Sequence, residues 1–92
     1  MTSEWFVYMV RTARGTLYTG ISTDVARRFA EHQAGAPKGA RSLRGKGPLE
    51  LVFSAPAGSR SRASRIEWHI KQWPSSRKEA LVRGELKLPD DL

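Results

Sequence analysis

Five polar or partly polar residues occupy positions where the sequence pattern predicts core side chains: Tyr8, Tyr18, Arg28, His32 and Glu67. Each alone has an ordinary structural explanation, because buried tyrosines can hydrogen-bond through their hydroxyls and arginine can pack its stem while its head stays in water. Arg28 and Glu67 could form a partly buried ion pair, and His32 could be a cation at a helix C-terminus. A domain this small gives up core area to hold all five, so together they predict a polar cluster at one face of a sheet, and a functional site.

The chemistry of this set is that of phosphate transfer. A single carboxylate with open coordination positions, Glu67, suits Mg²⁺ or Mn²⁺, which keeps several waters and takes oxygens from a phosphate ligand. An arginine can hold that phosphate and stabilise its transition-state charge. Tyrosine or histidine can move protons to and from the attacking and leaving oxygens. The set therefore predicts phosphodiester hydrolysis assisted by one divalent ion.

Other chemistries fit the sequence less well. The chain contains no cysteine, which excludes a disulfide framework and a thiolate nucleophile, and its two histidines are a poor set for zinc. We expect His69 on a helix surface. The glycine-rich basic stretch from Gly39 to Lys46 lacks the Walker spacing, so it is not predicted to bind nucleotides.

The charge predicts a polyanionic partner. Sixteen Lys and Arg against nine Asp and Glu give a formal net charge of +7 in 92 residues. Eleven of the sixteen are arginine, whose planar fork suits phosphate oxygens. We expect nucleic acid as the partner, with no membrane association. The absence of a leader, an apolar span and cysteine leads us to expect a cytoplasmic location.

Two short strands must position the tyrosines. Residues 5–11 and 16–22 are rich in aromatic and β-branched residues, and the connection TARG is short and contains a glycine, so a hairpin is expected. If Val10 lies opposite Thr16, then Tyr8 lies opposite Tyr18 on the same face. A slip of one residue would put the tyrosines on opposite faces, and the sequence alone does not fix the register.

Helices must position the remaining three residues. Ser22 to Asp24 supply N-cap candidates for a helix that continues to about Ala34, with Gly35 as its stop. The inward stripe of that helix starts with Val25 and Phe29, and Arg28 and His32 complete its spacing. Residues 59–73 form a second expected helix, whose apolar stripe includes Glu67 and which Pro74 ends.

The remaining segments complete the order ββαβαα. Residues 49–55 alternate as a third strand, and SSRKEALV opens a last helix in which Ser76 and Glu79 are spaced as a capping box. We therefore predict an α+β fold, a small three-stranded antiparallel sheet flanked by helices, in one domain over residues 1–84. Residues 85–92 are expected to be a short, loosely held C-terminal tail.

The loop over residues 35–48 is too long for a tight turn, and loops of this kind tend to be functional or disordered. It supplies four candidate phosphate contacts: Lys38, Arg41, Arg44 and Lys46. For each of them a solvated surface position is an equal alternative. Three further candidates lie at the start of the second long helix: Arg60, Arg62 and Arg65.

The sequence resembles the GIY-YIG nuclease family, and more narrowly its small stand-alone bacterial members. VYMV, then YTG ten residues on, then Arg28, His32 and Glu67 carry the resemblance, together with the segments LYTGIS, RRFAEH and GPLELVFSA in that order. The match covers roughly residues 4 to 84. The first motif reads Phe6-Val7-Tyr8 and lacks its glycine, and threonine replaces isoleucine in Tyr18-Thr19-Gly20.

The resemblance implies roles for single residues. Tyr8 and Tyr18 correspond to the two motif tyrosines, one of which would activate or orient the attacking water, and Gly20 corresponds to the glycine ending the second motif. Arg28 would bind the scissile phosphate and Glu67 would hold Mg²⁺, while His32 corresponds to a histidine of some members. The implied activity is metal-dependent DNA cleavage, structure-selective and linked to repair or processing.

Two other functions remain open. The chain could be a nucleic-acid-binding module without turnover, whose basic residues contact phosphates. It could also be a subunit that needs a protein partner, docked through Trp68 or Trp73. A separate DNA-binding domain has no room in 92 residues, so the preferred DNA structure is not predicted.

Overall fold

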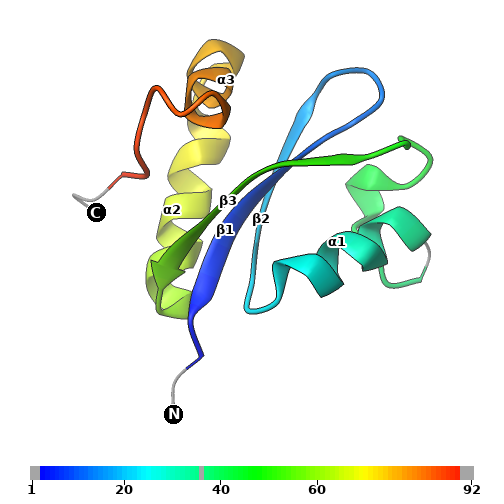
Figure 1. Ribbon diagram of the computed structural model, residues 1–92, viewed down its shortest axis with the longest axis horizontal. Helices are drawn as coiled ribbons and strands as arrows, with labels where there is room; N and C mark the ends of the chain where they lie inside the picture. The colour runs from blue at the N-terminus through cyan, green and yellow to red at the C-terminus, as the bar shows by residue number, and fades with distance from the viewer. Residues whose placement is uncertain (1–2, 36, 90–92) are drawn as a thin grey trace.

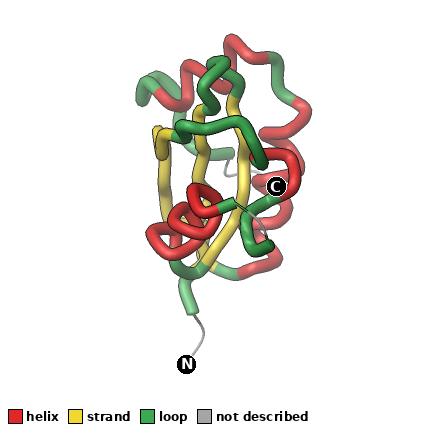
Figure 2. Tube along the Cα trace, turned by 90° about the vertical axis from the view of Figure 1, so that its right-hand side faces the viewer, coloured by secondary structure: helices red, strands yellow, loops and turns green. Residues whose placement is uncertain are grey.

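The computed structural model describes residues 3–35 and 37–89 and contains one three-stranded antiparallel sheet. Its strands are β1 (Trp5–Arg11), β2 (Leu17–Ser22) and β3 (Glu50–Gly58), in the spatial order β2-β1-β3. The helices are α1 (Val25–Ala34), α2 (Arg60–Gln72) and α3 (Ser75–Val82), with a short 3₁₀ turn, η1, at Arg41–Leu43. The predicted α+β class and ββαβαα order are confirmed. Figure 1 shows α1 and α2 on opposite sides of the sheet, and Figure 2 shows the three strands side by side.

The hairpin register differs by two residues from the pairing considered from the sequence. Val10 pairs with Tyr18, and Tyr8 pairs with Gly20. The turn explains the difference: Thr12 N–H donates to the Thr16 carbonyl at 2.9 Å, so these two residues close a three-residue connection. Gly15 supplies its positive φ of 91°. Because a shift of two preserves the face, both tyrosines still project to the same side.

Strand β3 is longer than the expected 49–55 and contains Pro56. It is an edge strand, where a missing backbone donor is tolerated. Its pairing with β1 shifts register between Trp5 and Phe6 and again between Met9 and Val10. Such irregularities increase the local twist of a sheet.

One face of the sheet packs against α2 and α3. Val7 and Met9 of β1 are fully buried there against Ile66 and Ile70 of α2 and Leu81 of α3. These side chains alternate along β1 with those of the other face, as a strand requires. This layer is the main hydrophobic core.

The opposite face packs against α1 and the loop that follows it. Tyr8 and Val10 are buried there with Leu43 of η1 and Leu49, and Val25 and Phe29 of α1 lie against them. Asp24 caps α1 by accepting from the Arg27 backbone N–H at 3.0 Å, and Gly35 ends it at φ 82°. The predicted boundaries of this helix are therefore confirmed, and the long loop carries its own core residue in Leu43.

One expectation for the C-terminal part was wrong. The helix α3 begins at Ser75 without a side-chain cap, and the Glu79 carboxylate instead receives two hydrogen bonds of 2.8 Å from Arg11 of β1. This pair joins α3 to the sheet, so Glu79 is not part of a capping box. Residues 85–89 contain no helix or strand, and Leu88 packs against the core. Residues 90–92 of the predicted tail lie outside the described residues. None of the helices in the described part of the chain is long and apolar enough to cross a membrane.

Candidate active site

Four of the five predicted residues meet between the sheet and α1. Tyr8 and Tyr18 project from β1 and β2, and Arg28 and His32 come from α1. The ring centres of Tyr8 and Tyr18 are 6.4 Å apart, and the His32 ring lies 5.9 Å from Tyr8 and 5.4 Å from Tyr18. Tyr8 and His32 are buried, whereas Tyr18 and Arg28 are half-buried. A cluster that is buried at its bottom and accessible at its rim suits a reaction on a ligand that arrives from solvent.

Gly20 makes room for the Tyr8 ring. A Cβ at Gly20 would lie 2.6 Å from the Tyr8 hydroxyl oxygen and 2.7 Å from the ring carbon that bears it. These separations are far inside van der Waals contact, so any side chain at position 20 would displace the tyrosine. The glycine is therefore required by the cross-strand packing of Tyr8.

His32 is hydrogen-bonded through both ring nitrogens. The Ala40 backbone N–H donates to Nδ1 at 3.0 Å, and Nε2 lies 2.7 Å from the Tyr8 hydroxyl oxygen. Because a backbone N–H can only donate, Nδ1 carries no proton, and the neutral ring holds its proton on Nε2. Nε2–H therefore donates to Tyr8. We assign this tautomer from the hydrogen-bond network.

Burial and charge keep His32 neutral. Burial is the main cause of its lowered pKa, the Arg28 cation lowers it further, and Glu31 partly opposes both. Protonation would also place a second N–H against the Ala40 N–H. The ring is therefore a fixed donor to Tyr8 at neutral pH, and it does not accept the tyrosine's proton.

A close turn after α1 delivers the Ala40 N–H. Gly39 N–H donates to the Gly35 carbonyl at 2.7 Å. A Cβ on Gly39 would lie 2.8 Å from that oxygen and 2.9 Å from the Glu31 carbonyl. Only glycine allows this approach, and the approach brings the Ala40 N–H to Nδ1 of His32.

Tyr8 is protonated at neutral pH. Burial, reinforced by the neighbouring Tyr18, raises its pKa well above the ordinary value of 10.0, while Arg28 acts in the opposite direction. The bond from His32 uses one lone pair of the Tyr8 oxygen. Arg28 and Tyr18 also interact with this hydroxyl, so Tyr8 is joined to each of the other three residues of the cluster.

Arg28 lies at the rim of the cluster. Its Nη1 donates to a Glu31 carboxylate oxygen at 2.8 Å and to the Lys38 carbonyl at 2.7 Å. The Glu31 hydrogen bond raises the pKa of Arg28, so the guanidinium stays charged. These two acceptors engage one side of a fork with five donors, which leaves others for a phosphate.

Glu67 comes from α2, which carries none of these four residues. α2 covers the face of the sheet opposite to the tyrosines (Figure 1), and the membership of Glu67 in the same site stays a prediction. The Glu67 carboxylate pairs with Lys71 at 3.1 Å, one helical turn along α2. α2 also packs against β2, the edge strand that carries Tyr18. At this edge of the sheet, β2 is therefore the strand that separates α2 from the layer that contains the tyrosines.

The donor set decides which metal Glu67 could hold. Within the described residues, no group of three or more His, Cys, Asp and Glu side chains could hold an ion. The Glu67 side chain is 23% exposed and its partner Lys71 is 50% exposed, so Lys71 can move away. One accessible carboxylate fits a hard ion such as Mg²⁺ that takes its other oxygens from water and phosphate. It does not fit zinc, which needs several protein ligands.

The four predicted phosphate contacts are all exposed: Lys38, Arg41, Arg44 and Lys46. The Lys38 carbonyl holds Arg28, Arg41 begins η1, and Arg44 donates to the Pro37 carbonyl at 3.2 Å. Lys46 lies beside the β1–β2 hairpin, where its carbonyl accepts from Ala13 N–H at 3.0 Å. Lys38 contacts Arg28 of the cluster, and Lys46 lines a cavity together with Tyr18. The binding role of all four stays a prediction.

The sequence did not indicate two features of this site. Gly39 and Ala40 contribute through their backbone N–H groups, and the type of a residue does not indicate which backbone N–H will donate to the site. Arg14 projects from the tip of the hairpin near Lys46. The sequence shows that Arg14 is a cation in a turn, but it does not show that this turn lies near the long loop.

Known proteins match nearly the whole chain. The family model described as the GIY-YIG catalytic domain matches residues 4–80. A UPF0213 protein of Cronobacter sakazakii is 65% identical over 83 residues, covering 90% of this chain and 85% of its own. A UPF0213 protein of Vibrio cholerae is 55% identical over 89 residues, covering 96% and 86%.

A solved structure agrees with these sequence matches. The solution NMR structure of a UPF0213 protein from Bacillus halodurans is 38% identical, with a TM-score of 0.55, over 87% of this chain and 83% of that chain. The family match spans both tyrosines, Arg28, His32 and Glu67. The chain therefore belongs to the GIY-YIG catalytic domain family.

Proposed function

We propose that this protein is a divalent-metal-dependent endonuclease that hydrolyses DNA phosphodiesters. The observation that carries the proposal is the chain of hydrogen bonds from Ala40 through His32 to Tyr8, beside the Arg28 guanidinium. It fixes a buried hydroxyl next to a cation that can bind phosphate. Membership of the GIY-YIG catalytic domain family also supports the proposed nuclease function.

Arg28 and Tyr8 take separate roles in this proposal. Arg28 binds the scissile phosphate with its remaining N–H groups and stabilises the charge that grows on the phosphate oxygens. Tyr8 accepts from His32 with one lone pair and uses the other to orient the attacking water. His32 positions Tyr8 and stays neutral throughout.

Tyr18 faces the incoming ligand. It is half-exposed, and its ring meets the His32 ring edge-on, at an interplanar angle of 70°. Substrate can reach its hydroxyl from solvent, so we assign Tyr18 to move a proton between the reacting oxygens and water.

Glu67 would hold Mg²⁺ or Mn²⁺ on the α2 side of β2. A bound ion would supply charge neutralisation at the phosphate and at the leaving oxygen. A phosphate at the β2 edge could contact Arg28 from one layer while its ion contacts Glu67 from the other. Lys71, whose Nζ lies 3.1 Å from the Glu67 carboxylate, would then release it.

Cleavage of a labelled DNA panel tests this proposal. Duplex, single-stranded, nicked and forked DNA are incubated with Mg²⁺ or Mn²⁺, with wild type beside Glu67→Ala. We expect metal-dependent cutting that the substitution abolishes while DNA binding stays nearly intact. Titration calorimetry with Mn²⁺ alone provides a readout of the ion site that does not depend on turnover. Equal cutting by both proteins would contradict the role of Glu67.

A binding module without turnover is the second candidate. The pairing of Arg28 favours it, because within the described residues the carboxylate that pairs with Arg28 is that of Glu31 and not that of Glu67. Under this hypothesis wild type cuts nothing in the panel, yet binds DNA with strong salt dependence. A partner-dependent subunit would gain cutting only on addition of cell extract; Trp68, 61% exposed on α2, is the residue to substitute in that case.

A further inference from the structure

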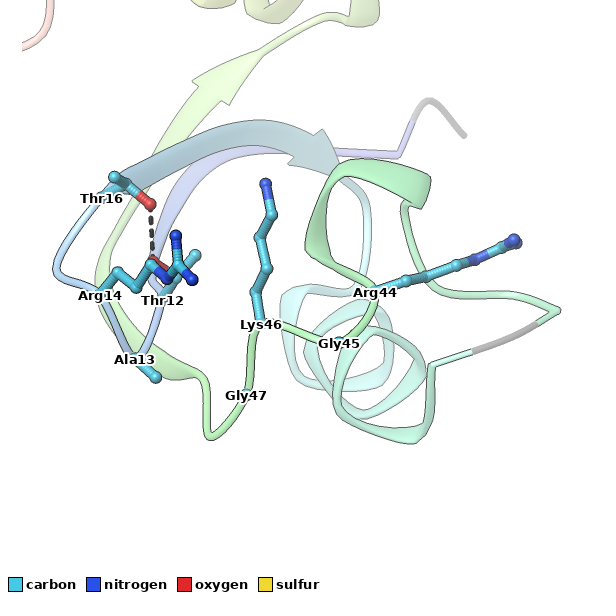
Figure 3. Close-up of a pocket in the computed structure, with 8 residues that line it drawn as sticks. All are labelled: Thr12, Ala13, Arg14, Thr16, Arg44, Gly45, Lys46 and Gly47. Carbon is cyan, nitrogen blue, oxygen red and sulfur yellow. Dashed lines mark hydrogen bonds between the residues drawn. The ribbon is translucent and has the colours of Figure 1, made fainter.

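A basic groove lies between the hairpin tip and the end of the long loop (Figure 3). It has a volume of about 580 Å³ and contains no acidic residue in its lining. Eight residues line it: Thr12, Ala13, Arg14, Thr16, Arg44, Gly45, Lys46 and Gly47. Figure 3 shows Arg14 and Lys46 extending into the space from the two segments, with Arg44 directed away from both.

Backbone bonds hold the two walls together. Ala13 N–H donates to the Lys46 carbonyl at 3.0 Å, which fixes the hairpin tip to the loop. The Thr12 and Thr16 hydroxyls bond to each other at 2.6 Å on the hairpin side. The groove is therefore formed before any ligand arrives, which lowers the entropic cost of binding.

Two of the three cations that line this groove, Arg14 and Lys46, are available for a ligand. Across residues 3–35 and 37–89, neither the Arg14 side chain nor the Lys46 side chain makes an ion pair or a hydrogen bond with the protein. By contrast, Arg11 and Arg28 are both held by carboxylates. Two facing cations without acidic partners attract an anion. Because they come from segments far apart in the sequence, folding does not require the two side chains to lie together.

The groove leads to the catalytic cluster. A second, smaller cavity of about 120 Å³ shares Thr12, Thr16 and Lys46 with it and is also lined by Tyr18. A single strand of nucleic acid lying on Tyr18 would therefore continue along Thr16 to Arg14 and Lys46. Neighbouring phosphates of one strand are several ångströms apart, which suits successive contacts along such a path.

We propose that Arg14 and Lys46 together bind a backbone phosphate that flanks the scissile one on the same strand. This inference rests on the proposed nuclease function and adds a substrate requirement to it: the strand must extend beyond the scissile bond on the groove side. Phosphate contacts of this kind set the position of a substrate and carry no sequence information. The groove thus makes the enzyme selective for polymer over isolated phosphodiesters.

Binding of fluorescent DNA in EDTA tests the groove independently of cleavage. The proteins are wild type, Arg14→Ala, Lys46→Ala, the double variant, and Lys87→Ala, which removes an exposed cation on the α3 side. We expect about tenfold weaker binding at low salt in the two single groove variants, because each loses a charge-assisted hydrogen bond. The double variant should lower the salt slope by about one phosphate, roughly 0.7 to 0.9. Lys87→Ala should change neither quantity.

A small substrate then separates the groove from the catalytic cluster. Hydrolysis of bis(p-nitrophenyl) phosphate, which has no flanking phosphate, should be the same in wild type and the double variant, while KM for DNA rises. If DNA is cut but every variant binds like Lys87→Ala, the groove proposal is overturned and the nuclease proposal stands. If wild type cuts nothing but the groove variants lose salt-dependent binding, the nuclease proposal fails and the groove stands as a phosphate site.

Discussion

The Tyr8 ring lies directly over Gly20, its cross-strand partner in the β1–β2 hairpin. A Cβ at position 20 would lie 2.6 Å from the tyrosine hydroxyl oxygen, the atom that receives the His32 hydrogen bond. The glycine at the end of the second motif thus controls the position of the hydroxyl in the first. This packing connects the two motifs physically.

Gly20→Ala should therefore displace Tyr8 and reduce cleavage. Forcing one extra carbon into a packed face costs typically 1–3 kcal/mol, so we expect the free energy of unfolding to fall by about that amount. The cleavage rate at a temperature where the variant stays folded should fall by more than tenfold, since displacement of about 1 Å can cost ~100-fold. Denaturant titration and single-turnover kinetics measure the two effects.

Ser54→Ala is the matched control for that substitution. Ser54 is the other lateral neighbour of Tyr8, on β3, and it is exposed. This change should leave both stability and cleavage near wild type. Equal behaviour of the two variants would show that Tyr8 does not depend on the space above Gly20.

His32→Ala should lower both stability and turnover. It leaves the Ala40 N–H without an acceptor and Tyr8 without its donor, and an unsatisfied buried group costs about 1–3 kcal/mol. The kcat should fall more than KM rises, because the substitution misplaces Tyr8 and leaves the phosphate cation in place. His69→Ala, which removes the histidine of α2, serves as control, and a similar loss there would contradict the positioning role.

The stability of the fold should depend on pH through His32. Its folded-state pKa lies below the ordinary value of 6.5, so the unfolded state binds the proton more readily. The His32 contribution to stability is complete above the unfolded pKa and is lost as the pH falls from about 6.5 toward the lowered folded value. Denaturant titrations from pH 7.5 to 5 should show this loss in wild type. A His32→Ala variant with the same pH slope would refute the assignment.

Arg28→Lys should retain charge but lose most of the activity. Lysine cannot keep the Glu31 and Lys38 bonds and also present a planar fork to phosphate. Loss of one donor that stabilises transition-state charge typically costs 100- to 1,000-fold in kcat, and we expect a decrease of about that size. Arg27→Lys, one position earlier on the exposed side of α1, is the control. Unchanged kcat in Arg28→Lys would remove the guanidinium from the mechanism.

The sequence was sufficient to predict the elements and four members of the cluster. The aromatic and β-branched run at residues 5–11, the Asp24 cap and the Gly35 stop are local signals, and local signals set the boundaries of strands and helices. Arg28 and His32 stood out because polar residues occupied the predicted inward stripe of α1. The two tyrosines lie on the same face whether Val10 pairs with Thr16 or with Tyr18. The prediction of a shared face was therefore correct although the predicted pairing was not.

The features that could not be predicted from the sequence depend on contacts between distant segments. The register required knowing that Gly15 forms a three-residue turn, and the fate of Glu79 depended on Arg11 of a strand 68 positions away in the sequence. The place of Glu67 required knowing which face α2 covers. The Ala40 bond to His32 comes from a loop whose path no periodicity describes. Each of these is a tertiary relationship without a local sequence signature.

The most direct test of the account is the single-turnover cleavage rate of Tyr18→Phe, measured beside its thermal unfolding. The substitution removes one half-exposed oxygen and retains the ring that packs against His32 and Tyr8. We predict metal-dependent cleavage of DNA by wild type, a decrease of at least about 100-fold in the variant, and a melting temperature within ~2 °C of wild type. Unchanged cleavage, or a loss of rate that only follows a loss of stability, would show that the tyrosines serve the core and not the reaction.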